Sequence, residues 1–296
     1  MGSLSESTTE RTTIGDLNKR FGIDIGTGQA APVTITSLAD DLQSVTPGAL
    51  FIVGRGVHVS DELITAAADR GAYAVLLPTS MRSRFGSSDP DIPLLFGDLS
   101  SEDLSSLAAQ MAGYPANQLA IFAVCGNGSA GAAEALADLL HVLGNPVGLI
   151  SNGNSYSLER DLVFSYPIGG LQVESMLFGA MEDGATSVVI DASDDTLLPG
   201  SLAGVSIDVC GLTNLMGGES GRTTHALMVS SLERYSPQIS ENTHATGRTS
   251  DSDEIAHENL PGTGERDLSM GIAMVMQAGI RKNGIRNALR VVRDFT

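Results

Sequence analysis

The residues best suited to chemistry form a glycine-rich loop within residues 123–131, which read Ala-Val-Cys-Gly-Asn-Gly-Ser-Ala-Gly. An apolar run precedes this loop and a long helical pattern follows it. A loop so placed can wrap backbone N–H groups around phosphates, while a lysine and a Ser or Thr hydroxyl serve the phosphates and their metal ion. Gly126, Asn127, Gly128 and Ser129 keep that skeleton, but the segment contains no lysine. We expect either residual anion binding at a helix N-terminus or a tight strand-to-helix turn alone.

Acidic and amide side chains follow two other apolar runs. Asp191 ends one run and is followed by Asp194 and Asp195, while Asn214 ends another. Carboxylate oxygens suit Mg²⁺, so Asp191 is the candidate metal ligand, but a solvated acidic cluster at the strand end is the favoured interpretation. Because ligands of open α/β sheets lie at the carboxyl ends of strands, Gly126, Asp191 and Asn214 could face one crevice.

The same loop allows a different chemistry. Residues 127–131 lie near the nucleophile-elbow pattern Gly-x-Ser-x-Gly of esterases, with a strand pattern before and a helix pattern after. The first glycine of that pattern is Asn127 here, and none of the five histidines has the context of a catalytic base or the spacing of metal ligands. Hydrolase chemistry is therefore the less well supported interpretation.

Composition excludes several classes of partner. The chain has 296 residues and a net charge of −18, a balance that repels nucleic acid and anionic membranes. No apolar run approaches the roughly 20 residues of a membrane span, and the polar start does not read as a signal peptide, so we expect no membrane insertion and a cytoplasmic protein. Cys125 and Cys210 are the two cysteines, and we expect both to be buried free thiols.

Hydrophobic periodicity predicts an α/β fold with two domains. Residues 1–30 read as a flexible tail, and residues 31–115 alternate short apolar runs with capped helical patterns. Residues 116–296 repeat the alternation, which favours a mainly parallel sheet, and residues 216–266 read as a polar mobile loop. Strands are expected at 49–53, 72–77, 92–96, 119–124, 147–150, 186–191 and 205–212, and helices at 60–70, 99–112, 130–143, 171–181, 268–278 and 285–295.

Several segments resemble a known family in the correct order. They include Val-Thr-Pro-Gly-Ala-Leu-Phe-Ile at 45–52, the run 66–76, Leu-Gly-Asn-Pro-Val-Gly-Leu-Ile at 143–150, Val-Ile-Asp-Ala-Ser at 189–193, Gly-Leu-Thr-Asn-Leu at 211–215 and the final helix pattern 279–295. Together they resemble the Mur ligases, particularly the UDP-N-acetylmuramoyl-tripeptide synthetase type. The resemblance implies a Mur-ligase-like N-terminal domain at 31–115 and a shortened, P-loop-type central domain at 116–296. The family's third, C-terminal ligase domain is expected to be absent.

The resemblance breaks at the residues that carry the family's chemistry. Active members have Gly-Thr-Asn-Gly-Lys-Thr in the loop, which places Cys125 on the first glycine, Ser129 on the lysine and Ala130 on the threonine. The family's glutamate on the metal-site strand is Asp191 here, and its following histidine is Asp195.

Further departures affect the other expected sites. The Asp-His pair expected after Asn214 is replaced by residues 217–219, and a lysine-bearing segment beyond it is deleted. In the first domain, the family's Asp-Ser-Arg reads Asp41-Leu42-Gln43, which weakens the expectation of uridine-nucleotide binding.

The energetic cost of these losses favours a catalytically impaired protein. Losing one preorganised donor typically costs about 2.7 to 4 kcal/mol in the transition state of such charge-stabilised reactions. The sequence thus predicts a Mur-ligase-like pseudoenzyme with a binding or regulatory role in peptidoglycan precursor synthesis, whose partner is a Mur ligase or another cell-wall enzyme. ATP and Mg²⁺ are the cofactors if a nucleotide site remains. The alternatives are an ATP-dependent amide-forming ligase that is weak or completed by a partner chain, and a subunit that binds a non-nucleotide metabolite.

Overall fold

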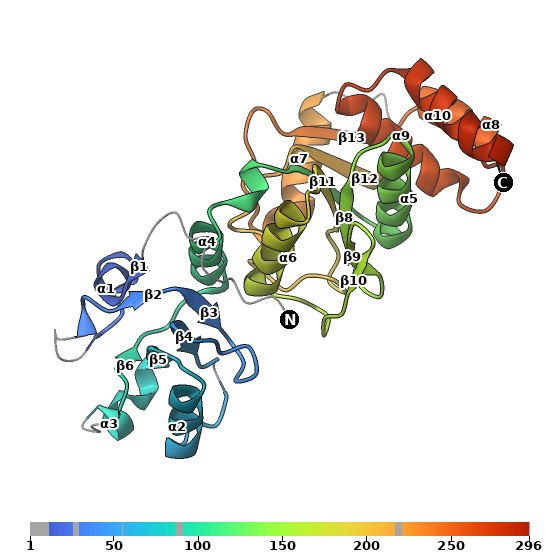
Figure 1. Cartoon of the computed structure of the whole chain (residues 1–296). Coiled ribbons are helices and arrows are strands. Elements are labelled where there is room, and N and C mark those ends of the chain that lie inside the picture. The colour runs from blue at the N-terminus through green and yellow to red at the C-terminus, as the bar shows by residue number, and fades with distance from the viewer. Residues whose placement is uncertain (1–11, 26–29, 55, 87–90, 217–220, 296) are drawn as a thin grey trace. The chain divides into compact units, whose positions relative to one another are not determined.

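The chain divides into two compact units, Met1–Tyr114 and Pro115–Thr296, which are described separately below (Figure 1). The structure is a computed structural model that describes residues 12–25, 30–54, 56–86, 91–216 and 221–295. Its α/β architecture is the predicted fold class. Among the described residues, no helix combines the length and the apolar character required to cross a bilayer.

Unit 1 is built on a four-stranded parallel sheet whose strand order follows the sequence. The strands are mostly buried apolar runs, and helices connect the later ones, as parallel pairing requires. The elements are β3 (Ser37–Ala39), β4 (Ala49–Ile52), α2 (Asp61–Asp69), β5 (Ala74–Leu77), η2 (Thr79–Met81), α3 (Arg82–Phe85), β6 (Leu94–Phe96) and α4 (Ser101–Met111).

The serine caps read from the sequence start both long helices of unit 1. The Ser60 side chain accepts a hydrogen bond from the Leu63 N–H at the start of α2. Ser100 and Asp103 form a reciprocal capping box at the start of α4. These hydroxyl groups satisfy N–H groups that have no partner inside the helix, so the chain turns into a helix at these serines.

The expected flexible tail is wrong for the described part of residues 1–30. The structure has regular elements there, namely strand β1 (Thr12–Thr13), which pairs with β2 (Thr34–Ile35), and helix α1 (Ile14–Phe21). A capping box between Thr13 and Asp16 starts α1, and Gly22 ends it in the left-handed conformation. Ile14 and Leu17 are buried, which ties this short helix to the core. Residues 1–11 and 26–29 lie outside the described residues.

Unit 2 contains a seven-stranded sheet in the order β10-β9-β8-β11-β7-β12-β13. Five of these strands run parallel, and the β9–β10 hairpin adds two antiparallel strands at one edge. The sheet is therefore mainly parallel, as predicted. Its strands are β7 (Ala120–Cys125), β8 (Val147–Ile150), β9 (Ser155–Ser157), β10 (Arg160–Leu162), β11 (Ser187–Asp191), β12 (Val209–Met216) and β13 (His244–Arg248).

Helices cover both faces of this sheet (Figure 1). Alternate residues of β7 separate the two layers, because Ile121 and Ala123 pack with α6 while Phe122 and Val124 pack with α5 and α9. This period of two is the geometry of a strand buried on both faces. The helices of unit 2 are η3 (Pro115–Asn117), α5 (Ser129–Val142), α6 (Gly170–Glu182), α7 (Gly221–Leu232), η4 (Glu233–Tyr235), α8 (Ser250–Asn259), α9 (Glu265–Gln277) and α10 (Lys282–Phe295).

The expected mobile loop at 216–266 is also wrong for most of its length. Helix α7, strand β13 and helix α8 lie within it. Thr224, Met228 and Leu232 are the buried side chains described along α7, at intervals of four residues, so a mostly polar helix is anchored by one narrow stripe. Residues 217–220 lie outside the described residues.

Two buried groups inside unit 2 are chemically unusual. Cys125 and Cys210 are buried free thiols, as expected, and their Sγ atoms lie 3.3 Å apart across β7 and β12. The hydrogen bond with Cys125, together with burial, raises the pKa of Cys210 well above its usual range. Glu174 of α6 is fully buried, and neither of its carboxyl oxygens has a hydrogen-bond partner among the described residues. Burial raises the pKa of Glu174 to about 8.

Candidate functional site

The candidate site lies at the carboxyl ends of three neighbouring strands of unit 2. Strand β7 is flanked by β11 and β12, with Asp191 opposite Val124 and Leu212 opposite Cys125. The segments that follow these strands therefore meet at one edge of the sheet. A Cβ added to Gly126 would lie 3.2 Å from Asn214 Nδ2. The structure thus brings Gly126, Asp191 and Asn214 to the same edge, as the strand order required.

The loop itself is an exposed turn that leads from β7 into α5. Gly126 and Gly128 have φ values of +104° and +76°, a region that glycine occupies without strain. The hydroxyl of Thr213, on β12, donates to the carbonyl oxygens of Cys125 at 3.2 Å and Asn127 at 3.0 Å. The turn is therefore fastened to the neighbouring strand by a side chain.

The two loop glycines are expected to differ in their tolerance of a side chain. Gly126→Ala should lower the free energy of unfolding by about 2–3 kcal/mol, because its new Cβ would combine positive φ with a position 2.4 Å from Thr213 Oγ1. Gly128→Ala should cost only about 1 kcal/mol, since nothing lies within 4 Å of its Cβ position. Urea denaturation of the two variants measures the difference. Equal losses would mean that Thr213 does not hold the turn.

Ser129, the first residue of α5, is bonded to the end of β11. Its side chain is buried, and its Oγ donates to Asp191 Oδ1 at 2.5 Å. The other oxygen, Asp191 Oδ2, accepts hydrogen bonds from Ser193 Oγ at 2.8 Å and Thr196 Oγ1 at 2.6 Å. Three hydroxyl groups thus share one carboxyl group that is 1% exposed. We call Ser129, Asp191, Ser193 and Thr196 the hydroxyl cluster.

The hydroxyl cluster connects several strands of the sheet. The Asn152 N–H, just after β8, donates to Thr196 Oγ1 at 3.0 Å. The ends of β8 and β11 and the start of α5 are consequently joined through side chains. Within the described ranges, no lysine or arginine pairs with Asp191. The carboxyl group is engaged entirely by neutral donors.

The neighbouring acids do not join Asp191 in a metal site. Asp194 accepts a hydrogen bond from Tyr235 Oη at 2.8 Å and lies 3.1 Å from Arg234 Nε. Burial and this bond to Asp194 raise the pKa of Tyr235. Asp195 is exposed. In the part of the chain that the structure describes, no three His, Cys, Asp or Glu side chains are arranged to hold a metal ion.

Asp267, an acid that the sequence did not single out, also lies beside the loop. A Cβ added to Gly131, in the first turn of α5, would lie 3.0 Å from Asp267 Oδ2 of α9. An acid near a helix N-terminus interacts favourably with the free N–H groups there. It also places negative charge where a phosphate would otherwise gain from the same N–H groups. Asp267 stands in an ordinary helical pattern, so nothing in the sequence marks it.

The geometry does not support the esterase interpretation. A serine nucleophile needs a base within hydrogen-bond reach, most often a histidine. The Ser129 hydroxyl donates to Asp191, and no histidine is among the partners described for it. Ser129 also has only 3% of its surface exposed.

Comparisons with known proteins place this geometry in context. No family model matches the chain. The UDP-N-acetylmuramoyl-L-alanyl-D-glutamate–2,6-diaminopimelate ligase of Pseudomonas putida is 30% identical over 184 residues, covering 61% of this chain and 37% of the relative. The ligase of the same name from Xylella fastidiosa is 32% identical over 193 residues, covering 63% and 38%. The matches span less than two fifths of the length of these relatives.

Solved structures show the same fold at lower sequence identity. A crystal structure of MurF from Acinetobacter baumannii matches 95% of this chain and 68% of its own length, with a TM-score of 0.57 and 15% identity. A structure of a UDP-N-acetylmuramoyl-L-alanyl-D-glutamate–2,6-diaminopimelate ligase matches 88% and 63%, with a TM-score of 0.55 and 16% identity. Both units of this chain therefore share the architecture of these enzymes.

Proposed function

Since the chain is a relative of the Mur ligases, we propose that it is a Mur-ligase-like protein that acts by binding and not by ATP-dependent ligation. The process it serves is peptidoglycan precursor synthesis, in which its curated relatives are ligases. The hydroxyl cluster is the observation that carries this proposal.

The residues of the loop do not fit a magnesium nucleotide. A lysine in such a loop neutralises phosphate charge, whereas Ser129 is neutral and donates its hydroxyl hydrogen to Asp191. Both Asp191 oxygens are already occupied by hydroxyl donors, which a Mg²⁺ ion would have to displace. Asp267 adds a further negative charge beside α5. Losing one preorganised donor alone typically costs about 2.7 to 4 kcal/mol, a hundred- to a thousandfold in rate.

Unit 1 supports a binding role with a site of its own. A cavity of about 490 Å³ lies beyond the carboxyl ends of β4, β5 and β6, where open α/β sheets bind ligands. The residues that line it include Gly56, His58, Pro78 and Arg84. Asp98 also lines the cavity, so His58 and Arg84 place two basic side chains there beside one acid. We propose that an anionic ligand, a nucleotide-linked wall precursor, binds at this position.

Calorimetric titration tests both parts of the proposal. Mg-ATP is expected to give no binding heat with the natural chain, whereas UDP-N-acetylmuramoyl-L-alanyl-D-glutamate is expected to bind. The Ser129→Lys variant restores a cation beside Asp191 and is expected to bind Mg-ATP measurably. Ser231→Lys, an exposed serine of α7, adds the same charge elsewhere and serves as the control.

Three results would contradict parts of the proposal. Micromolar binding of Mg-ATP to the natural chain would make an impaired ligase the better description. Mg²⁺-dependent ATP hydrolysis that arises only after mixing with an intact Mur ligase, above the rate of that ligase alone, would favour a ligase completed by a partner chain. Failure of the UDP precursor to bind would reject the role proposed for unit 1.

A further inference from the structure

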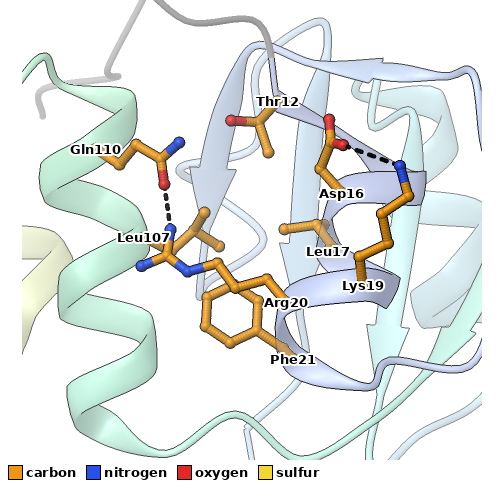
Figure 2. A pocket seen from close by; sticks show the side chains of 8 residues that line it. All are labelled: Thr12, Asp16, Leu17, Lys19, Arg20, Phe21, Leu107 and Gln110. Carbon is orange, nitrogen blue, oxygen red and sulfur yellow. Dashed lines mark hydrogen bonds and ion pairs between the residues drawn. The ribbon is translucent and has the colours of Figure 1, made fainter.

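A second cavity in unit 1, of about 490 Å³, lies between α1 and α4 (Figure 2). Its size falls within the range of small-molecule sites. Apolar side chains form its inner wall, since Leu17 and Leu107 line it and each is 1% exposed. Phe21 adds an aromatic ring at the same wall. The cavity can therefore receive the carbon skeleton of a ligand.

The guanidinium group of Arg20 borders this wall. Arg20 donates to Gln110 Oε1 and lies 4.8 Å from the centroid of the Phe21 ring. The neighbouring Lys19 is 3.9 Å from Asp16, so those two charges offset each other. No acid pairs with Arg20 among the described residues. Within the described ranges, one positive charge thus has no paired acid, in a chain whose net charge is −18.

A buried hydroxyl group also lines the cavity. Thr12 is 6% exposed, and its Oγ1 has no hydrogen-bond partner in the described part of the chain. Figure 2 shows this hydroxyl on the side of Thr12 that faces α4 and the end of Arg20. Buried polar groups in proteins almost always have a hydrogen-bond partner. The Thr12 hydroxyl therefore indicates that a ligand in this cavity supplies its partner.

We propose that this cavity binds a small monocarboxylate with an apolar body. The guanidinium of Arg20 has donors left beyond its bond to Gln110 and matches the planar geometry of a carboxylate. The Thr12 hydroxyl supplies a further hydrogen bond, and Leu17, Leu107 and Phe21 contact the carbon chain. A single uncompensated cation matches one negative charge, which favours a carboxylate over a phosphate dianion.

This inference is independent of the function proposed above. The cavity shares no residue with the glycine-rich loop of unit 2 or with the cavity at His58 and Arg84. Its occupation therefore neither requires nor excludes nucleotide binding.

Titration of the full chain with hexanoate, followed by calorimetry, tests the site. Hexanoate is expected to bind, and Arg20→Gln is expected to weaken it about tenfold, the worth of one charge-assisted hydrogen bond. Thr12→Val should weaken binding about threefold to tenfold and, without ligand, should leave the melting temperature equal or higher, because it removes an unpartnered hydroxyl. Arg70→Gln removes the same charge from an exposed position on unit 1 and should change nothing.

Neutral and phosphate probes separate the alternatives. Hexan-1-ol should bind at least tenfold more weakly than hexanoate, and inorganic phosphate should not compete. Equal binding of hexan-1-ol, stronger binding of phosphate, an unchanged affinity in Arg20→Gln, or no binding of hexanoate would each overturn the proposal. Circular dichroism of each variant establishes that it is folded.

Discussion

Replacing Glu174 with glutamine is expected to stabilise unit 2 strongly at pH 8 and hardly at all at pH 4.5. Glu174 is fully buried, and its two carboxyl oxygens lack described partners, so the neutral form is the one that fits the fold. Its pKa is raised to about 8 in the folded protein, against about 4.3 in an unfolded chain. Between these values the folded state holds a proton that the unfolded state has released.

The sign of the pH dependence follows from this difference. The contribution of Glu174 to stability is fully present below about pH 4.3 and is lost as pH rises to about 8. The slope is about 1.4 kcal/mol per pH unit, and the total loss is about 5 kcal/mol. For a unit of this size, such a loss lowers the melting temperature by roughly 10 °C. Glutamine does not ionise, so the variant should lack this slope.

Melting curves of both proteins between pH 4.5 and 8 measure the effect. The difference in melting temperature should widen steadily across that range. Glu182→Gln makes the same chemical change at the exposed end of α6 and should follow the natural chain at every pH. Parallel curves for Glu174→Gln and the natural chain would mean that Glu174 ionises equally in the folded and unfolded states.

Removing the carboxyl group of the hydroxyl cluster is the second change with a large expected effect. Asp191→Ala leaves Ser129, Ser193 and Thr196 without their shared acceptor. Leaving buried polar groups unpaired costs about 1–3 kcal/mol each, although some of the hydroxyls will find other partners. We expect the free energy of unfolding to fall by about 3–5 kcal/mol, the range of a broken buried network.

Urea denaturation measures this loss, and a double-mutant cycle assigns it. Ser129→Ala combined with Asp191→Ala should cost less than the sum of the single changes, because both remove the same 2.5 Å hydrogen bond. Asp195→Ala changes an exposed acid that lies between Ser193 and Thr196 in the sequence and should have little effect. A loss below about 1 kcal/mol for Asp191→Ala would contradict a closed network. Stabilisation of the natural chain by Mg²⁺, absent in the variant, would instead identify Asp191 as a metal ligand.

The parts of the fold that the sequence predicts are those with one dominant local signal. Strand β5 is an uninterrupted apolar run, β11 has an apolar interior between Ser187 and Asp191, and Ser60 and Ser100 are recognisable as helix caps. Helix α1 escaped prediction although Thr13, Asp16 and Gly22 are local start and stop signals, because its eight residues are too few for a clear periodic pattern. Such a short helix depends on the tertiary contacts of the buried Ile14 and Leu17.

For the candidate site, the sequence predicts where the residues lie but not which residues they bond to. Parallel strand order predicts that the loop, Asp191 and Asn214 meet at one edge, because that follows from topology alone. The bond between Ser129 and Asp191 joins residues 62 positions apart and depends on a distance of 2.5 Å. Sequence pattern identifies both residues and leaves Asp191 as either a metal ligand or part of a solvated acidic cluster. It does not show that the distant Ser129 lies beside the nearby Ser193 and Thr196 around this carboxyl group.

The central place of β7 in its sheet has a consequence for how the chain is made. Ile121 to Val124 are almost wholly buried, and both flanking strands come later in the sequence. The first of them, β11, begins at Ser187, about 60 residues after Cys125. At ribosomal rates of about 5–20 residues per second, β7 waits roughly 3 to 12 seconds with two unpaired edges. The central strand of the sheet therefore cannot be paired on either edge until the chain has been made as far as β11.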